Sequence, residues 1–172
     1  MKNKVKGWQK LFLFCLGLFA GTAFCMKWME TDFLVKGEKF TIIGLEISYS
    51  KAKIAEIFSA IDIHVKSILK YHLVFDFAFM AGVYPGIASL NMIAYQKTSN
   101  KTLQKILLGF AFFQFIAWGC DIIENCYLLN WLEVPSGINH FELYHSVVFA
   151  KWIIALSGAI LAIPLALRRN NA

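Results

Sequence analysis

Four stretches of the chain are almost entirely apolar, and polar residues collect between them. They run from Trp8 to Met26, from Tyr71 to Tyr95, from Leu103 to Leu132 and from Tyr144 to Leu167. A helix needs about 20 mainly apolar residues to cross a membrane. The pattern therefore predicts an all-α membrane protein, a bundle of four transmembrane helices that forms a single domain over residues 1–172.

The first apolar stretch also has features of a cleavable signal peptide. Lysines precede it, and its uncharged core, from Leu11 to Met26, is short for a membrane span. However, Phe24 interrupts the small-residue pattern that a cleavage site needs. Gly17 and Gly21 have the G-x-x-x-G spacing that lets two membrane helices pack closely. We therefore expect an uncleaved anchor, with cleavage as the alternative.

The composition supports a membrane location. Hydrophobic residues make up 58% of the 172 residues and charged residues 16%, whereas soluble domains have about 45–50% and about 25%. So much apolar surface excludes a disordered chain and does not fit inside a small soluble globule. The composition names no reaction, and the chain has no G-x-S-x-G, H-E-x-x-H or phosphate-binding G-K-[ST] motif.

The net charge of +6 is explained by membrane topology. Nine basic residues without acidic neighbours lie before the first span, between the second and third spans, and after the fourth: Lys2, Lys4, Lys6, Lys10, Lys97, Lys101, Lys105, Arg168 and Arg169. The loop 133–143 holds two glutamates and neither lysine nor arginine. Because cytoplasmic loops are enriched in lysine and arginine, we expect both termini in the cytoplasm. Membrane lipid is the expected partner of this charge, and nucleic acid is not.

Residues 27–70 form the only sizeable segment expected outside the membrane. A turn at 36–39 between apolar residues predicts a small hairpin, which continues through the alternating Leu45, Ile47 and Tyr49. Ser50 is an expected N-cap for a following helix, whose apolar residues recur at helical spacing from Ile54. We expect an extracytoplasmic cap made of a hairpin and an amphipathic helix. That helix lies on the membrane, caps the bundle, or packs on its own hairpin.

Ionisable residues inside membrane spans are costly, so each one is a candidate functional residue. This chain has four, Asp76, Asp121, Glu124 and Lys151, on three different spans. At 1.5 Å per residue, all four fall in the outer half of the membrane, most of them at similar depth. Lys151 shares its helix face with small residues, which indicates that it points into the bundle.

These residues predict one polar cavity that opens toward the outside. Asn125 belongs to the same helix face as Asp121 and Glu124, and we expect His72 and His145 at the mouth. Three carboxylates close together in a low dielectric cannot all stay ionised, so we expect at least one to carry a proton near neutral pH.

Three functions fit such a cluster. In a binding or catalytic site, Asp121 and Glu124 act as general acid and base or as ligands of a divalent cation, with Asp76 as their partner and Lys151 as counter-charge. A lipid headgroup is the natural ligand at that depth. Alternatively, the cluster is a structural ion-pair network in a non-catalytic assembly protein, or part of a small proton- or ion-coupled carrier. Gly17/Gly21 and Gly82/Gly86 are candidate faces for a second copy or a protein partner.

Several short motifs resemble a group of small bacterial inner-membrane proteins of uncharacterised function. They are Gly44–Leu45–Glu46–Ile47, Asp76–Phe77–Ala78–Phe79 with Tyr84, Asp121-x-x-Glu124–Asn125, and Ala150–Lys151–Trp152. The resemblance spans residues 40–155 and implies no activity. It implies that Glu46 belongs to the membrane cluster as an outer lid, although the alternating pattern alone makes Glu46 an exposed strand residue. Glu46 and Tyr84 are then candidate ligand-binding residues, together with Asn125, His72 and His145.

Overall fold

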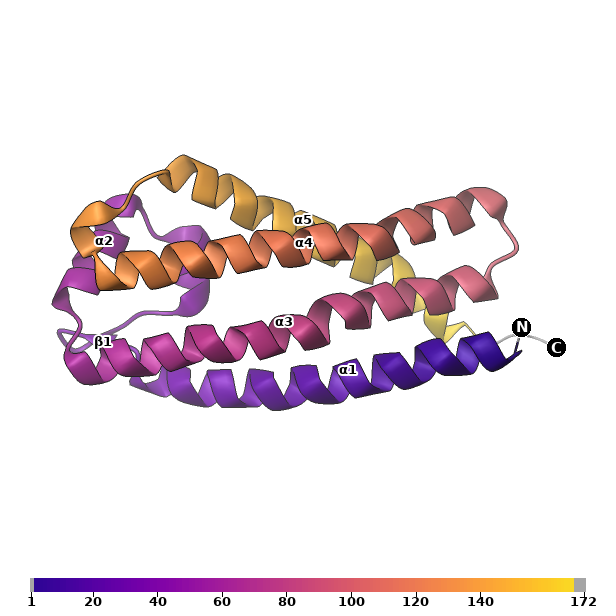
Figure 1. Cartoon of the computed structure of the whole chain (residues 1–172), viewed down its shortest axis with the longest axis horizontal. Coiled ribbons are helices and arrows are strands. Elements are labelled where there is room, and N and C mark those ends of the chain that lie inside the picture. Colours follow the sequence, from indigo (N-terminus) through magenta and orange to yellow (C-terminus); the bar gives the residue numbers. More distant parts are fainter. Residues whose placement is uncertain (1, 169–172) are drawn as a thin grey trace.

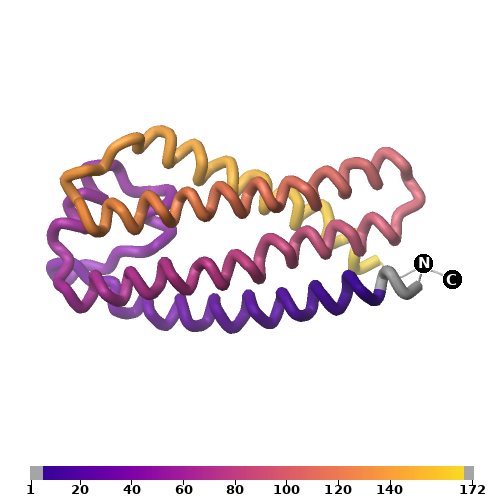
Figure 2. The backbone as a smooth tube through the Cα atoms, in the orientation of Figure 1, coloured from indigo at the N-terminus to yellow at the C-terminus, as the bar shows by residue number. Residues whose placement is uncertain are grey.

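Four long helices lie side by side, with a small cap at one end of the bundle and the start of α1 and the end of α5 at the other (Figures 1 and 2). The computed structural model describes residues 2–168 and the side chains of residues 6–168. The elements are α1 (Lys2–Met29), η1 (Glu30–Asp32), β1 (Leu34–Val35), β2 (Glu38–Lys39), η2 (Gly44–Ser48), α2 (Lys51–Ala60), α3 (Ile63–Lys97), α4 (Lys101–Glu133), η3 (Pro135–Gly137) and α5 (Phe141–Leu167). Helix α3 is central, because it packs against α1, α4 and α5.

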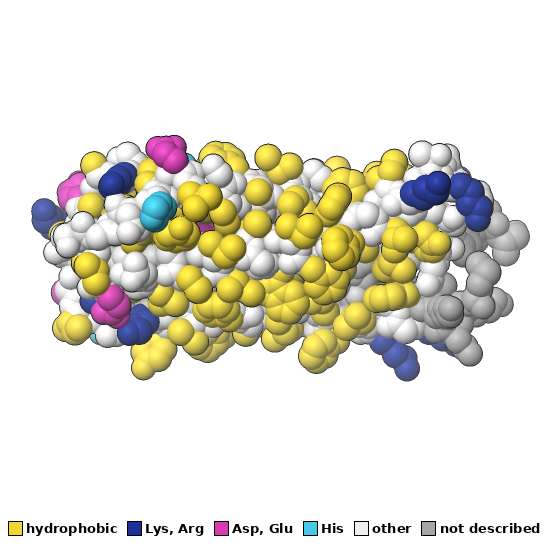
Figure 3. All heavy atoms as spheres, turned by 45° about the horizontal axis from the view of Figure 1, so that its top comes forward, with side chains coloured by type: hydrophobic (Ala, Val, Ile, Leu, Met, Phe, Trp, Pro, Cys, Tyr) yellow, Lys and Arg dark blue, Asp and Glu magenta, His cyan; other side chains and the backbone are white. Residues whose placement is uncertain are grey.

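The structure confirms the predicted all-α bundle of four long apolar helices. Each of α1, α3, α4 and α5 is long and apolar enough to cross a membrane, and apolar side chains cover the surface between the charged ends (Figure 3). The helices extend beyond the predicted apolar stretches, and polar caps start α3 and α4 in the flanking segments. The Asp62 side chain accepts a hydrogen bond from the backbone N–H of Val65, and Asn100 caps α4 in the same way.

The cap differs from the predicted hairpin. Only β1 and β2 pair, with two residues each, and the alternating residues that follow form the π-helical turn η2 instead of a strand. The turn requires Gly44, because a Cβ at this position would clash with the Tyr49 ring. Thr41 Oγ1 also accepts a hydrogen bond from the Gly44 N–H at 2.9 Å. An alternating pattern cannot report such a local close approach.

Helix α2 begins after Ser50, whose hydroxyl accepts a hydrogen bond from the Lys53 N–H, as predicted. Its buried residues, Ile54, Ile57 and Phe58, belong to a core that the cap shares with the ends of α3, α4 and α5. The apolar face of α2 is therefore covered by protein. Of the three predicted placements, this packing matches a helix that caps the bundle.

Helix α1 packs closely on α3 at Gly82 and Gly86. A Cβ on Gly82 would lie 2.7 Å from the backbone nitrogen of Phe19, and one on Gly86 would lie 3.2 Å from Cys15 Cβ. This glycine face is therefore occupied by the chain's own α1, which corrects its assignment as a surface for another chain. Gly17 and Gly21 lie on the exposed side of α1. A Cβ added to either glycine would have no neighbouring atom of the described residues within 4 Å.

Candidate functional site

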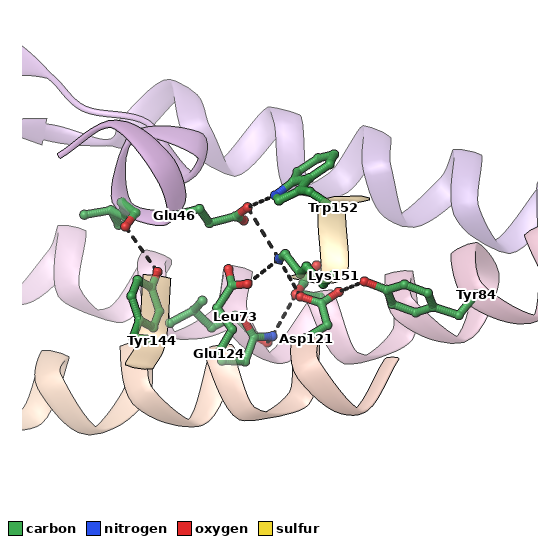
Figure 4. A network of polar contacts seen from close by, with 11 residues as sticks. Glu46, Leu73, Tyr84, Asp121, Glu124, Tyr144, Lys151 and Trp152 are labelled. Atoms are coloured by element: carbon green, nitrogen blue, oxygen red, sulfur yellow. Dashed lines mark hydrogen bonds and ion pairs between the residues drawn. The ribbon is translucent and has the colours of Figure 1, made fainter. Parts of the chain in front are cut away.

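Lys151 lies at the centre of a buried ionic cluster near the cap end of the bundle (Figure 4). Its Nζ lies 2.7 Å from Asp121 Oδ1 and 2.5 Å from Glu124 Oε2, both on α4. It also lies 3.4 Å from Glu46 Oε2 of the cap. One ammonium thus binds three carboxyl groups from two separate parts of the chain.

Further hydrogen bonds connect this cluster to α3. The Tyr84 hydroxyl donates to Asp121 Oδ2 at 2.7 Å (Figure 4). Asn125 Nδ2 donates to Asp76 Oδ2 at 2.7 Å and to the carbonyl oxygen of Leu73 at 3.3 Å. Residues from η2, α3, α4 and α5 therefore meet in one network, as the sequence predicted for the four intramembrane charges.

Helical spacing explains how α4 supplies so many of these groups. Asp121, Glu124 and Asn125 are three and four residues apart, so they share one helix face, and all three are buried. On α5, Lys151 shares its buried face with Tyr144, Val148, Gly158 and Ala162. The two faces meet because α4 and α5 pack against each other.

Glu46 reaches the cluster from the cap, because η2 packs against α5 next to Lys151 (Figure 4). Its Oε2 accepts a hydrogen bond from the indole N–H of Trp152 at 3.1 Å. Burial raises the pKa of the Glu46 carboxyl above its ordinary value; the Lys151 ammonium lowers it and the Asp121 carboxylate raises it. The placement agrees with what the sequence resemblance implied and not with an exposed strand residue.

The cluster holds more acidic groups than basic ones. Three carboxyl groups, those of Glu46, Asp121 and Glu124, lie within 3.4 Å of the single ammonium of Lys151. A fourth, that of Asp76, accepts a hydrogen bond from Asn125 beside them. Glu124 is 1% exposed, and its Oε1 has no hydrogen-bond donor among the described residues. An excess of buried negative charge is costly unless protons or another cation compensate it.

A cavity of about 420 Å³ lies against this cluster. Its polar part is formed by Glu46, Asp76, Tyr84, Asp121, Lys151 and Trp152. Its apolar part is formed by Phe19, Phe79, Val83, Ile87, Ala155, Leu156 and Ala159. Because the side chains of Phe19 on α1 and Leu156 on α5 are exposed, the cavity reaches the apolar outer surface of the bundle. It has the size of ordinary small-molecule pockets, about 300–1,000 Å³.

The structure does not bring every predicted residue to this cavity. His72 is buried under the cap, 5.3 Å from the Phe33 ring and 3.8 Å from Glu30 Oε1. His145 lies 4.5 Å from the Phe141 ring. Neither histidine lines the cavity, since both are on parts of their helices closer to the cap. Glu124 and Asn125 belong to the network but lie behind the cavity wall.

Trp152 is a site residue that the pattern of charges missed. It follows Lys151 directly, so its only sequence signal is its place within the Ala-Lys-Trp motif. Among residues 6–168, no group of three or more histidine, cysteine or acidic side chains is arranged to hold a metal ion. The carboxyl groups of Glu46, Asp121 and Glu124 are directed at Lys151 Nζ, which takes the position that a metal ion would need. The divalent cation therefore stays a prediction, and the described residues provide no set of ligands for it.

No protein-family model matches the chain, and no curated protein or solved structure matches it. The resemblance to small inner-membrane proteins therefore stays a prediction. Any function must be inferred from the geometry of the site itself.

Proposed function

We propose that the chain is a multi-pass protein of the cell membrane that binds an amphiphilic molecule, such as a membrane lipid, in the cavity beside Lys151. The single observation that carries this proposal is the composition of the cavity wall. One part is polar and charged, with Glu46, Asp76, Asp121 and Lys151, and the other is aliphatic and aromatic. A ligand that fills both parts needs a polar head and an apolar tail.

The proposed orientation puts the cap outside and both termini in the cytoplasm of a bacterial inner membrane. The lysines and arginines without acidic neighbours support this, because positive charge favours the cytoplasmic side. The cavity then lies in the outer half of the membrane, where the exposed Phe19 and Leu156 face lipid tails. A lipid can enter from the side without crossing water.

A second candidate is a structural ion-pair network in an accessory or assembly protein. The observation that favours it is that Lys151 already contacts carboxyl groups of both α4 and the cap. Such contacts hold helices in register whether or not a ligand binds. Acid–base roles for Asp76, Asp121, Glu124 and Lys151 stay predictions, since no reaction follows from these contacts.

A substitution that fills the cavity distinguishes amphiphile binding from a purely structural ion-pair network. Ala159→Phe places a large side chain on the α5 wall of the cavity, and Ala78→Phe makes the same change at an exposed position of α3. We expect native mass spectrometry to show bound lipid on the wild-type protein and on Ala78→Phe, and its loss from Ala159→Phe. Equal lipid occupancy in all three proteins would contradict binding in the cavity and favour the structural network.

A further inference from the structure

The charged groups on the cavity wall discriminate between possible polar heads. Three carboxyl groups, those of Glu46, Asp76 and Asp121, face the cavity beside one ammonium, that of Lys151. That ammonium is already held by three carboxyl groups within 3.4 Å. An anionic head such as a phosphate would meet these carboxylates without a free positive charge to bind. The wall therefore disfavours an anion.

Asp76 is the carboxyl group best placed to receive a cation. It lines the cavity, and its Oδ2 accepts one hydrogen bond, from Asn125 Nδ2 at 2.7 Å. It forms no ion pair with any residue in the described part of the chain, whereas Asp121 and Glu46 both contact Lys151. A partly buried carboxyl group without a counter-charge either holds a proton or pairs with a cation, so Asp76 is free to receive a cation that enters the cavity.

A second observation points the same way. Glu124 is turned toward Lys151 behind the cavity wall, is 1% exposed, and has one oxygen without a donor among residues 6–168. The network as a whole therefore lacks both positive charge and N–H donors. A primary ammonium supplies one positive charge and three donors.

We infer that the amphiphile has a protonated amine as its polar head, which docks on Asp76 while its apolar tail lies along α3 and α5. This inference rests on the proposed function and names the chemistry of its ligand. Phe79, Val83 and Ile87 on α3, with Leu156 and Ala159 on α5, provide the apolar wall for the tail. The ligand is either an aminophospholipid from the membrane or a hydrophobic amine from the medium.

Three probes with the same tail and different heads test this inference. The full-length protein in dodecyl maltoside is titrated with dodecylamine, dodecanol or dodecyl phosphate, and bound probe is counted by native mass spectrometry. We expect wild-type protein to bind the amine at least about tenfold more tightly than either of the others, since a buried charge pair contributes that much or more. Dodecanol or dodecyl phosphate binding as tightly as the amine would overturn the inference.

Two isosteric variants locate the amine. Asp76→Asn removes the charge at the cavity and should abolish the preference for dodecylamine. Asp62→Asn makes the same change at the start of α3, where asparagine caps a helix as well as aspartate does, and should keep the preference. Retention of the preference in Asp76→Asn would overturn the docking site. Should Asp76→Asn fail to fold, the probe series on the wild-type protein still decides the chemistry of the head.

The outcomes also distinguish a ligand from the membrane from a ligand from the medium. They show in addition whether only the amine head is wrong or the proposed amphiphile binding as a whole. Co-purification of phosphatidylethanolamine from the native membrane supports the lipid, and lipid-free protein that binds dodecylamine supports the soluble amine. Enrichment of phosphatidylglycerol would overturn the inference. If anionic or neutral amphiphiles bind and Ala159→Phe excludes them, the amine is wrong and the proposed function stands. If no amphiphile binds the wild-type protein, both are wrong.

Discussion

Near the cap, ionisable side chains from η2, α3, α4 and α5 meet beside Lys151, whereas the polar side chains buried in the opposite half, among residues 6–168, are neutral. There, Asn91 Nδ2 donates to the carbonyl oxygens of Ile87, at 2.9 Å, and Gly158, at 3.2 Å. Gln114 Nε2 donates to the carbonyl oxygen of Ile154 at 3.3 Å. These amides bind backbone, so they serve helix packing.

Cavity size does not distinguish the two halves. The opposite half has a cavity of about 430 Å³ between α1, α3 and α4, lined almost entirely by apolar side chains such as Leu11, Met92 and Phe112. The cavity near the cap is nearly equal in volume but has charged residues on one wall. In the opposite half, the side chains of Asn91 and Gln114 bind the backbone of neighbouring helices, which indicates a role in helix packing. Near the cap, charged side chains line the cavity, which indicates a ligand whose polar head complements them.

The largest effect is expected when the central cation is removed. Lys151→Met leaves the carboxyl groups of Glu46, Asp121 and Glu124 buried without their counter-charge, which should lower the free energy of unfolding by about 3–5 kcal/mol. Lys70→Met is the control, because Lys70 pairs with Glu133 on the exposed surface and should contribute at most about 1 kcal/mol. Denaturant titration in detergent measures both. Equal losses would show that the cluster is not a buried ionic network.

A moderate effect is expected where α1 closes onto α3. Gly82→Val forces its side chain against the Phe19 backbone, which lies 2.7 Å from the Cβ position, and overpacking of this kind costs about 1–3 kcal/mol. It should also reduce amphiphile binding, because Phe19 is part of the cavity wall. Gly17→Val, on the exposed side of α1, is the matched control. A thermal midpoint of Gly82→Val equal to that of Gly17→Val would contradict the close α1–α3 contact.

The sequence was sufficient to predict the four helices and the meeting of Asp76, Asp121, Glu124 and Lys151. Apolar length defines a membrane helix, and three- to four-residue spacing puts polar groups on one face. The sequence was insufficient for η2, because an alternating pattern does not report the close contact of the Tyr49 ring with Gly44 that fixes the turn. The positions of His72 and His145 were also missed, since small differences in depth decide which side chains reach the cavity.

A smaller effect is expected from the same substitution in each half. Asn91→Ala removes one interhelical hydrogen bond and Asn125→Ala removes two, and each such bond contributes about 0.6 kcal/mol on average inside membranes. Both variants should therefore lose only small amounts of stability, with the larger loss in Asn125→Ala. Only Asn125→Ala should change amphiphile binding, because it releases Asp76. Unchanged lipid occupancy in Asn125→Ala, or reduced occupancy in Asn91→Ala, would remove the distinction between the halves.

The smallest effect is a pH dependence carried by Glu46. Its pKa is raised in the folded protein, so the folded state holds this proton more tightly than the unfolded state. Stability should therefore fall as pH rises from near 4.5, the ordinary value, toward the raised pKa. Glu46→Gln should weaken this fall, as measured by thermal midpoints between about pH 4.5 and 8. Parallel curves for the two proteins would show that Glu46 does not titrate in this way.

The most direct measurement is photocrosslinking in the membrane. A lipid analogue with a photoreactive group on its tail is activated in native membranes, and the labelled residues are mapped by mass spectrometry. We predict saturable labelling at Phe79, Leu156 and Ala159, which excess unlabelled lipid prevents. Labelling that spreads evenly over the exposed apolar surface, or that favours Met92 and Phe112 in the opposite half, would contradict an amphiphile site beside Lys151.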